Sequence, residues 1–165
     1  MESLRADVVT QHRKMEDCYN SSEYSADRQT DELPISMSRK SSAQKAQKLF
    51  VEAATRLQNG DAAGARRRLE KVSRMAPNSA AVWYNLALAG QHLGLHSRAI
   101  REYEKSLRIS PEQVDALVNL GLSYKHLGDS GAAMESAKKA LSLAWSHPRA
   151  LNLVGSLMAE SGYLP

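Results

Sequence analysis

From residue 46 onward, apolar residues recur at intervals of three and four, the spacing that places them on one face of an α-helix. Two such stripes follow residue 80, the first formed by Trp83, Leu86, Ala87 and Gly90 and the second by Ala99, Ile100, Tyr103 and Leu107. Gly94 lies between the stripes and suits the left-handed conformation that commonly ends a helix. Pro111 follows the second stripe and prevents that helix from continuing. The pattern therefore predicts two helices joined by a tight turn.

The same pattern returns at a constant interval along the chain. The glycines that mark it are Gly60, Gly94, Gly128 and Gly162, and the first three are followed at a constant offset by Ala65, Ala99 and Ala133. This period divides the chain into repeats 46–79, 80–113 and 114–147 and a partial repeat 148–165. Small residues at the recurring alanine positions let two helices cross at a separation of about 8 to 10 Å. We therefore expect each repeat to be a closely packed helix pair.

Residues 1–45 have a different character. They are poor in apolar side chains and contain a polar stretch at residues 21–30 and a serine-rich run that ends at Ser42. Such a composition predicts a mostly disordered polar arm. A short helix near residues 3–19 is the alternative for part of the arm, because several apolar residues there fall roughly on one helical face.

Composition narrows the function classes. Aromatic residues make up only 5% of the chain and hydrophobic residues 42%, mainly Ala, Leu and Val, which favours many contacts between helices over an aromatic core. Cys18 is the only cysteine, so one chain cannot form an internal disulfide or supply several thiolates to a zinc or iron–sulfur site. Neither a signal peptide nor an apolar run long enough for a membrane span is predicted, and we expect a reducing, cytoplasmic location.

The sequence contains no recognisable catalytic or cofactor motif. A glycine-rich phosphate loop, a nucleophile elbow, a zinc-binding His-Glu-x-x-His and a dinucleotide fingerprint are all missing from it. His92 and His96 have the spacing of a metal pair on a helix, but Gly94 should end the helix between them. We expect no catalytic residue, no metal and no cofactor.

Basic residues gather in the second helices of the first two repeats, as Arg66, Arg67, Arg68 and Arg74 and as Arg98, Arg101, Lys105 and Arg108. Glu70, Glu102 and Glu104 interrupt these runs, and no aromatic residues interleave them as stacking platforms for bases. The arrangement favours a solvated charged face over a nucleic-acid-binding surface.

The repeats resemble the tetratricopeptide repeat family, whose signature is a helix–turn–helix unit of about 34 residues. The second repeat matches it through Trp83, Leu86, Gly94, Ala99, Tyr103 and Pro111, and the third through Leu117, Leu120, Gly121, Tyr124, Gly128, Ala133, Ala140 and Leu141. Glu52 departs from the pattern at a position where Leu is expected, and Trp145 replaces the third Pro. The resemblance covers residues 46–165 and implies an all-α, right-handed superhelix of antiparallel helix pairs, with three full repeats plus one half repeat.

In this family the first helix of each pair lines a concave groove that binds peptides or other proteins. Family geometry then places the following residues in the peptide groove: Phe50, Tyr84, Asn85, Leu88, Asn119, Leu122 and Lys125. The implied function is that of a noncatalytic protein–protein interaction scaffold with a protein or peptide partner. The Lys and Arg positions of the family's carboxylate clamp hold other residues, including Phe50, so binding to heat-shock chaperone tails is not expected.

Asn85 and Asn119 occupy the same position in successive repeats. They resemble the asparagine ladder of O-GlcNAc transferases, in which side-chain amides bind the backbone of an extended peptide. The alternative is that both asparagines serve packing within the fold. The ladder predicts that Asn119→Ala weakens peptide binding and leaves the melting temperature almost unchanged.

The partial repeat raises two further alternatives. It lacks a second helix, which leaves a helix with Leu151, Val154, Leu157 and Met158 half covered. An apolar end face favours association with another subunit or protein. Alternatively, the chain is a fragment of a longer protein. The alternative function is then that of an N-terminal, substrate-recruiting region of a larger enzyme of the glycosyltransferase, methyltransferase or oxygenase type.

Overall fold

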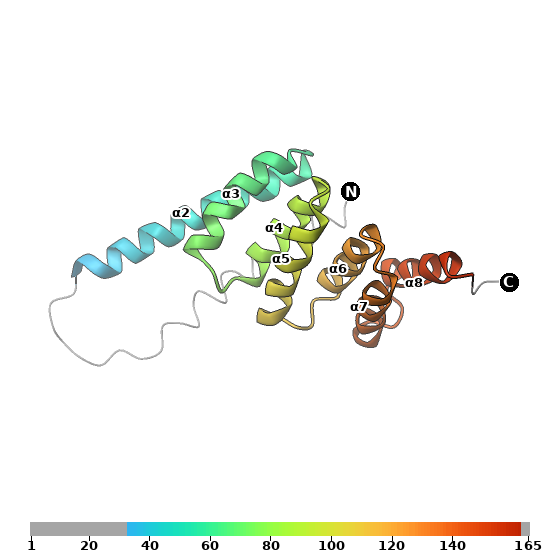
Figure 1. Ribbon diagram of the computed structural model, residues 1–165. Coiled ribbons are helices and arrows are strands. Elements are labelled where there is room, and N and C mark those ends of the chain that lie inside the picture. The colour runs from blue at the N-terminus through green and yellow to red at the C-terminus, as the bar shows by residue number, and fades with distance from the viewer. Residues whose placement is uncertain (1–32, 163–165) are drawn as a thin grey trace. The chain divides into compact units, whose positions relative to one another are not determined.

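The computed structural model describes residues 33–162 of the chain, and this part contains seven α-helices and no strand (Figure 1). The helices are α2 (Leu33–Gln58), α3 (Ala62–Met75), α4 (Ala80–His92), α5 (His96–Ile109), α6 (Val114–His126), α7 (Ser130–Leu143) and α8 (Pro148–Glu160). The described part is therefore all-α, as the apolar periodicity predicts. The short helix expected near residues 3–19 lies outside the described residues.

The repeat period of the sequence reappears in the helix bounds. Helices α4, α6 and α8 begin at Ala80, Val114 and Pro148, and the same offset separates the starts of α3, α5 and α7. The four recurring glycines all have positive φ, between 72° and 81°, a conformation that favours glycine because it has no Cβ. These glycines end the first helix of every pair at the same place.

Helix α7 ends at Leu143, the position equivalent to Ile109 and Met75, although Trp145 replaces the proline of the other repeats. The next residue, Ala144, has non-helical backbone angles (φ −145°, ψ 85°), and its N–H still donates to the carbonyl of Ala140. The helix therefore stops without the covalent restriction of a proline, and the repeat keeps its length.

Helix α2 begins at Leu33, so residues 33–45, which the sequence analysis placed in the polar arm, are helical. Pro34 is tolerated because it stands in the first turn, where a backbone N–H has no helical partner. Residues 35–59 contain neither Pro nor Gly. No helix-breaking residue therefore stops the helix from extending towards its N-terminus.

The described residues divide into two compact units, one that ends at Val82 and one that begins at Trp83. In the first unit α2 packs against α3, and the residues buried there include Phe50, Ala53, Leu69 and Val72. The second unit contains most of α4 and all of α5 to α8, in which consecutive helices from α5 onward pack against each other.

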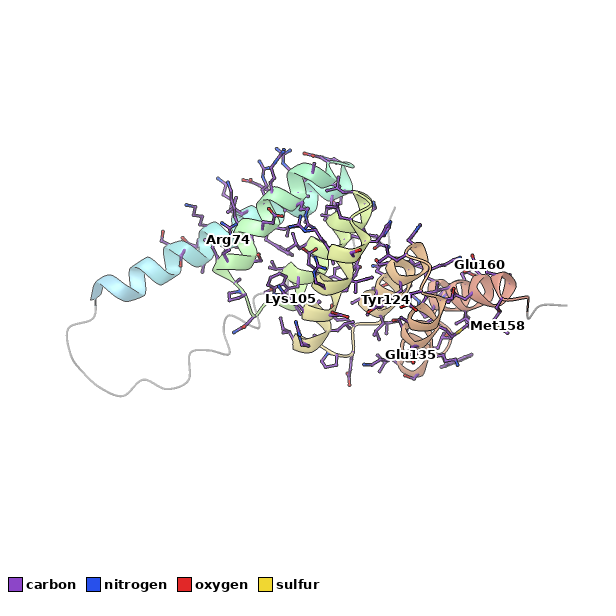
Figure 2. All side chains as sticks on the ribbon, in the orientation of Figure 1. Arg74, Lys105, Tyr124, Glu135, Met158 and Glu160 are labelled. Carbon is purple, nitrogen blue, oxygen red and sulfur yellow. The ribbon has the colours of Figure 1, made fainter. Side chains whose placement is uncertain are left out.

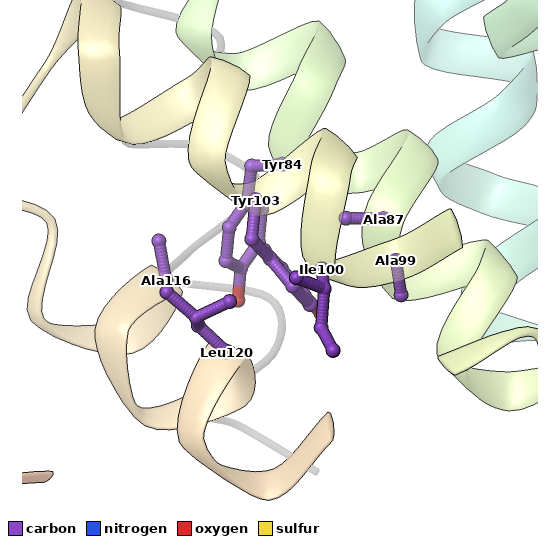
Figure 3. Packing of buried hydrophobic residues seen from close by; sticks show 7 residues of the cluster. All are labelled: Tyr84, Ala87, Ala99, Ile100, Tyr103, Ala116 and Leu120. Atoms are coloured by element: carbon purple, nitrogen blue, oxygen red, sulfur yellow. The ribbon is translucent and has the colours of Figure 1, made fainter. Parts of the chain in front are cut away.

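The core of the second unit combines large aromatic residues with small ones. The rings of Tyr84 and Tyr103 meet edge to face, with their centroids 5.8 Å apart. Ala116 and Leu120 of α6 belong to the same cluster (Figure 3). Ala99 and Ala133 are fully buried. Gly121 also lets α6 pack closely against its neighbours, since a Cβ there would stand 2.7 Å from Cδ2 of Leu153. These contacts agree with the expectation that small residues mark the helix crossings.

Candidate peptide-binding site

Six of the predicted groove residues lie in the second unit, on the first helices of their repeats. Tyr84, Asn85 and Leu88 come from α4, and Asn119, Leu122 and Lys125 from α6. We call these six residues together with Arg149 of α8 the α4–α6–α8 face. Phe50 belongs to the first unit, where its side chain is buried, and its role in a groove stays a prediction.

Asn119 connects the three helices of this face. Its Nδ2 donates a hydrogen bond to the hydroxyl of Tyr84 at 3.1 Å, and its Oδ1 accepts one from the guanidinium of Arg149. The side chain is only 2% exposed. Because both ends of the amide are engaged inside the protein, the structure favours the packing interpretation of Asn119 over a rung of an asparagine ladder. Asn85 is buried as well.

Arg149 is a residue of this face that the sequence analysis missed. Its guanidinium contacts Asn119 and also Asp115, with 3.5 Å between Nη1 and Oδ1 of the carboxylate. The side chain remains 51% exposed, and a guanidinium has five N–H donors, so donors remain for a ligand. The repeat period could have found it, because Arg149 occupies the position in the partial repeat that Asp115 occupies in the third repeat.

Lys125 ties α6 to α8. Its Nζ donates to Oγ of Ser156 at 2.8 Å and lies 2.9 Å from a carboxylate oxygen of Glu160, which Figure 2 labels on α8. Its charge is therefore partly neutralised. Leu88 and Leu122 are half-buried and pack at the edges of the apolar clusters. They leave part of their apolar surface accessible beside the polar network.

The two histidines considered as a metal pair lie on different helices, because α4 ends at His92 and α5 begins at His96. His96 instead stacks on His126, with ring centroids 4.4 Å apart and the planes 12° from parallel. Burial, together with the neighbouring His126, lowers the pKa of His96 below its usual value. Parallel stacked rings do not point their nitrogens at a common point, and the residues the structure describes contain no cluster of three or more potential metal ligands.

Within residues 33–162, no helix combines the length and the apolar character that a bilayer crossing requires.

Comparison with known proteins identifies the repeats. A family model described as tetratricopeptide repeat matches residues 50–114, and a second model with the same description matches residues 114–144. No curated protein matches the chain.

Several solved structures share the fold. MamA is 24% identical, with a TM-score of 0.69 over 71% of this chain and 68% of its own. The first tetratricopeptide domain of Spaghetti (RPAP3), bound to the HSP90 peptide SRMEEVD, is 18% identical, with a TM-score of 0.69 over 72% of this chain and 94% of its own. The Sgt2 tetratricopeptide domain of Aspergillus fumigatus is 20% identical, with a TM-score of 0.65 over 73% of this chain and 85% of its own. The helix bounds, the matched models and these structures together show that the chain belongs to the tetratricopeptide repeat family.

Proposed function

We propose that this protein is a noncatalytic adaptor that binds an extended peptide segment of a protein partner on the α4–α6–α8 face. The observation that carries the proposal is the network around Asn119, which holds the half-exposed guanidinium of Arg149 between α6 and α8. Asp115, Asn119 and Leu122 follow one another at helical spacing, so apolar and charged surface share one side of α6. The family relationship supports the proposal, since the related RPAP3 domain binds a peptide.

The chemistry of this face suits a peptide main chain. The N–H donors of Arg149 that are not directed at Asn119 or Asp115 can donate to peptide carbonyls or to a carboxylate. The carboxylate of Asp115 can accept from a peptide N–H. Leu88 and Leu122 offer apolar surface that a partner side chain can cover, and burial of apolar surface contributes to affinity.

The proposal is tested by selecting peptides from a displayed random library against the full 165-residue chain. The affinity of the selected peptides is then measured by fluorescence polarisation for the unchanged protein and for Arg149→Ala. We expect the affinity to fall about tenfold in Arg149→Ala, because a charge-assisted hydrogen bond is lost. Circular dichroism verifies that the variant is folded.

Arg101→Ala is the matched control, because Arg101 is an exposed arginine of α5 outside this face. It should leave the affinity unchanged. Equal affinities for unchanged protein and Arg149→Ala would refute the proposed site, and a library that yields no binding peptide would refute the function. The peptide SRMEEVD serves as a comparison ligand, for which we expect no specific binding because the cations of a carboxylate clamp are not provided at Phe50 and Asn119.

We place this function in the reducing cytoplasm, on the ground that the sequence contains a single cysteine. The measurement that decides this is the distribution of a tagged full-length chain between cell fractions.

A further inference from the structure

A second feature of interest is a hollow in the first unit, between α2 and α3. It has a volume of about 370 Å³. Leu49 and Glu52 of α2 line one side, and Arg67, Arg68, Glu70, Lys71 and Arg74 of α3 line the other. It belongs to a different unit from the α4–α6–α8 face, and the proposed adaptor function does not rest on it.

The charges around this hollow are unbalanced. Arg68 pairs with Glu52, with 3.2 Å between Nε and Oε2. Arg66 pairs with Glu70, with 3.4 Å between Nε and Oε1. The remaining cations, Arg67, Lys71 and Arg74, are exposed, and none of them forms an ion pair among the residues that the structure describes.

The three unpaired cations form one stripe. They stand at positions i, i+4 and i+7 and so lie on one face of α3, over about 10 Å at a rise of about 1.5 Å per residue. Figure 2 labels Arg74, whose side chain is near the C-terminal end of that helix. Glu52 and Glu70 are paired with other arginines, and Asp61, whose pKa Arg67 helps to lower, is paired with Arg56, so the stripe keeps a net positive charge.

The second repeat has a different residue at the position of Leu49. The same stripe recurs there, at the equivalent positions, as Arg101, Lys105 and Arg108. Lys105 lies over the ring of Trp83, 4.2 Å from its centroid. Leu49 is the residue at the position of Trp83 in the first repeat, and its smaller side chain cannot cover Lys71 in the same way. Leu49, which lines the hollow, thus stands at the position that a tryptophan takes in the second repeat.

From this arrangement we infer that the hollow binds a phosphoryl dianion. Its lining has four cations and two carboxylates, which leaves two positive charges. A phosphate monoester carries a charge of about −1.5 to −2 near pH 7 and offers three acceptor oxygens. Arginine guanidinium groups bind such oxygens in bidentate geometry, and lysine adds a point charge. A phosphorylated side chain of another protein and free phosphate present the same chemistry.

The test uses the full chain and a labelled glycine–serine peptide that carries one phosphoserine. Fluorescence polarisation compares it with its unphosphorylated twin, and inorganic phosphate is added as a competitor. We expect the phosphopeptide to bind at least tenfold more tightly than its twin. Competition by inorganic phosphate at concentrations near the phosphopeptide's dissociation constant assigns the site to free phosphate. Competition only at far higher concentrations assigns it to a phosphorylated partner, and both results support the inferred chemistry.

Two variants locate the binding. Lys71→Gln removes a cation from the hollow, and Leu49→Trp fills the hollow without changing any charge. Both should reduce phosphopeptide affinity at least tenfold, with circular dichroism showing that each is folded. Lys105→Gln, the same change at the equivalent position of the second repeat, is the matched control and should have no effect.

Equal binding of the two peptides would overturn the inference. So would an equal loss in Lys71→Gln and Lys105→Gln, because that result would indicate general attraction to a basic surface. A single-stranded RNA that binds more tightly than the phosphopeptide, and that loses affinity equally in both lysine variants, would assign the stripe to nucleic acid instead.

Discussion

Asn119 shows how a residue that resembles a ligand-binding group can be used inside the fold. The sequence places it at a recurring position of the first helices, where family geometry predicts a groove. The hydrogen-bond partners of the Asn119 amide are side chains that come from other repeats. Tyr84 lies 35 residues before it and Arg149 lies 30 residues after it, so no local pattern around Asn119 reveals the two hydrogen bonds.

For Asn119→Ala we now expect a clear loss of stability, in place of the almost unchanged melting temperature that the ladder predicts. The substitution removes the hydrogen bond that Asn119 donates to the Tyr84 hydroxyl and the one that it accepts from Arg149. The free energy of unfolding should fall by about 1 to 3 kcal/mol, because two hydrogen bonds are lost and each typically contributes about 0.5 to 1.5 kcal/mol. Urea denaturation measures the change, with Asn152→Ala at an exposed position of α8 as the control. Equal small losses in both variants would contradict the packing role.

His96 makes the stability of the protein depend on pH. Burial and the adjacent His126 lower its folded-state pKa below the ordinary value of 6.5, so the unfolded chain binds the proton more tightly. The neutral His96 ring makes its full contribution to the free energy of unfolding when the pH is above the ordinary pKa of 6.5. This contribution is lost as the pH falls towards the lower folded-state pKa. Urea denaturation at about pH 8 and about pH 5 should show a decrease in unfolding free energy that is smaller in His96→Gln. An identical decrease in His96→Gln would contradict this assignment, and His92→Gln, at an exposed position, should behave like the unchanged protein.

At the scale of single elements, most helix ends could be predicted because a local signal fixes them. The glycines with positive φ end the first helices, and the alanines at constant offset mark the crossings. The long α2 could not be predicted in the same way, because its first part is serine-rich and lacks an apolar stripe. A missing Gly or Pro allows a helix to continue but does not fix where it begins, whereas a Gly or Pro that is present marks a helix end.

The second helices of the repeats differ in their N-caps, which leads to a stability prediction. Asp61 and Asp129 accept hydrogen bonds from backbone N–H groups of α3 and α7, but Leu95, at the equivalent position before α5, makes no side-chain cap. Leu95→Asp should therefore raise the free energy of unfolding by about 0.5 to 1 kcal/mol, and Asp129→Ala should lower it by about 1 kcal/mol. Urea denaturation at about pH 8 keeps His96 neutral during the comparison.

Both changes act at the same point of equivalent repeats, so each is a control for the other. If Leu95→Asp left the unfolding midpoint where it is while Asp129→Ala lowered it, the equivalence of the three cap positions would be refuted.

At the scale of the whole molecule, the family and the all-α fold follow from the repeat period, whereas the ligand-binding surface follows only in part. The period assigned Tyr84, Asn119 and Lys125 to the first helices, and the structure connects Tyr84 to Asn119 and Lys125 to α8. The repeat period did not indicate which side chains keep hydrogen-bond donors available for a ligand. That depends on side-chain length and on ion pairs between helices, such as the one between Lys125 and Glu160.

The two faces of α8 lead to a prediction about association. One face packs inward through Leu153 and Leu157, and a second apolar stripe contains Leu151, Val154 and Met158, of which Leu151 is 48% and Met158 37% exposed. Figure 2 labels Met158 on this helix. A helix with apolar residues on both faces is typical of one covered on both sides, and exposed apolar patches mark interaction surfaces.

We therefore expect the full chain to associate through this second stripe, with a molar mass by light scattering that rises as the concentration increases. Association buries Leu151 and Met158, so the double variant Leu151→Glu/Met158→Glu should keep the mass of a monomer over the same range, since burying unpaired carboxylates costs several kcal/mol. Leu143→Glu, at an exposed leucine of α7, is the control and should associate like the unchanged chain. A constant monomer mass for the unchanged chain would show that copies of the chain do not cover the stripe.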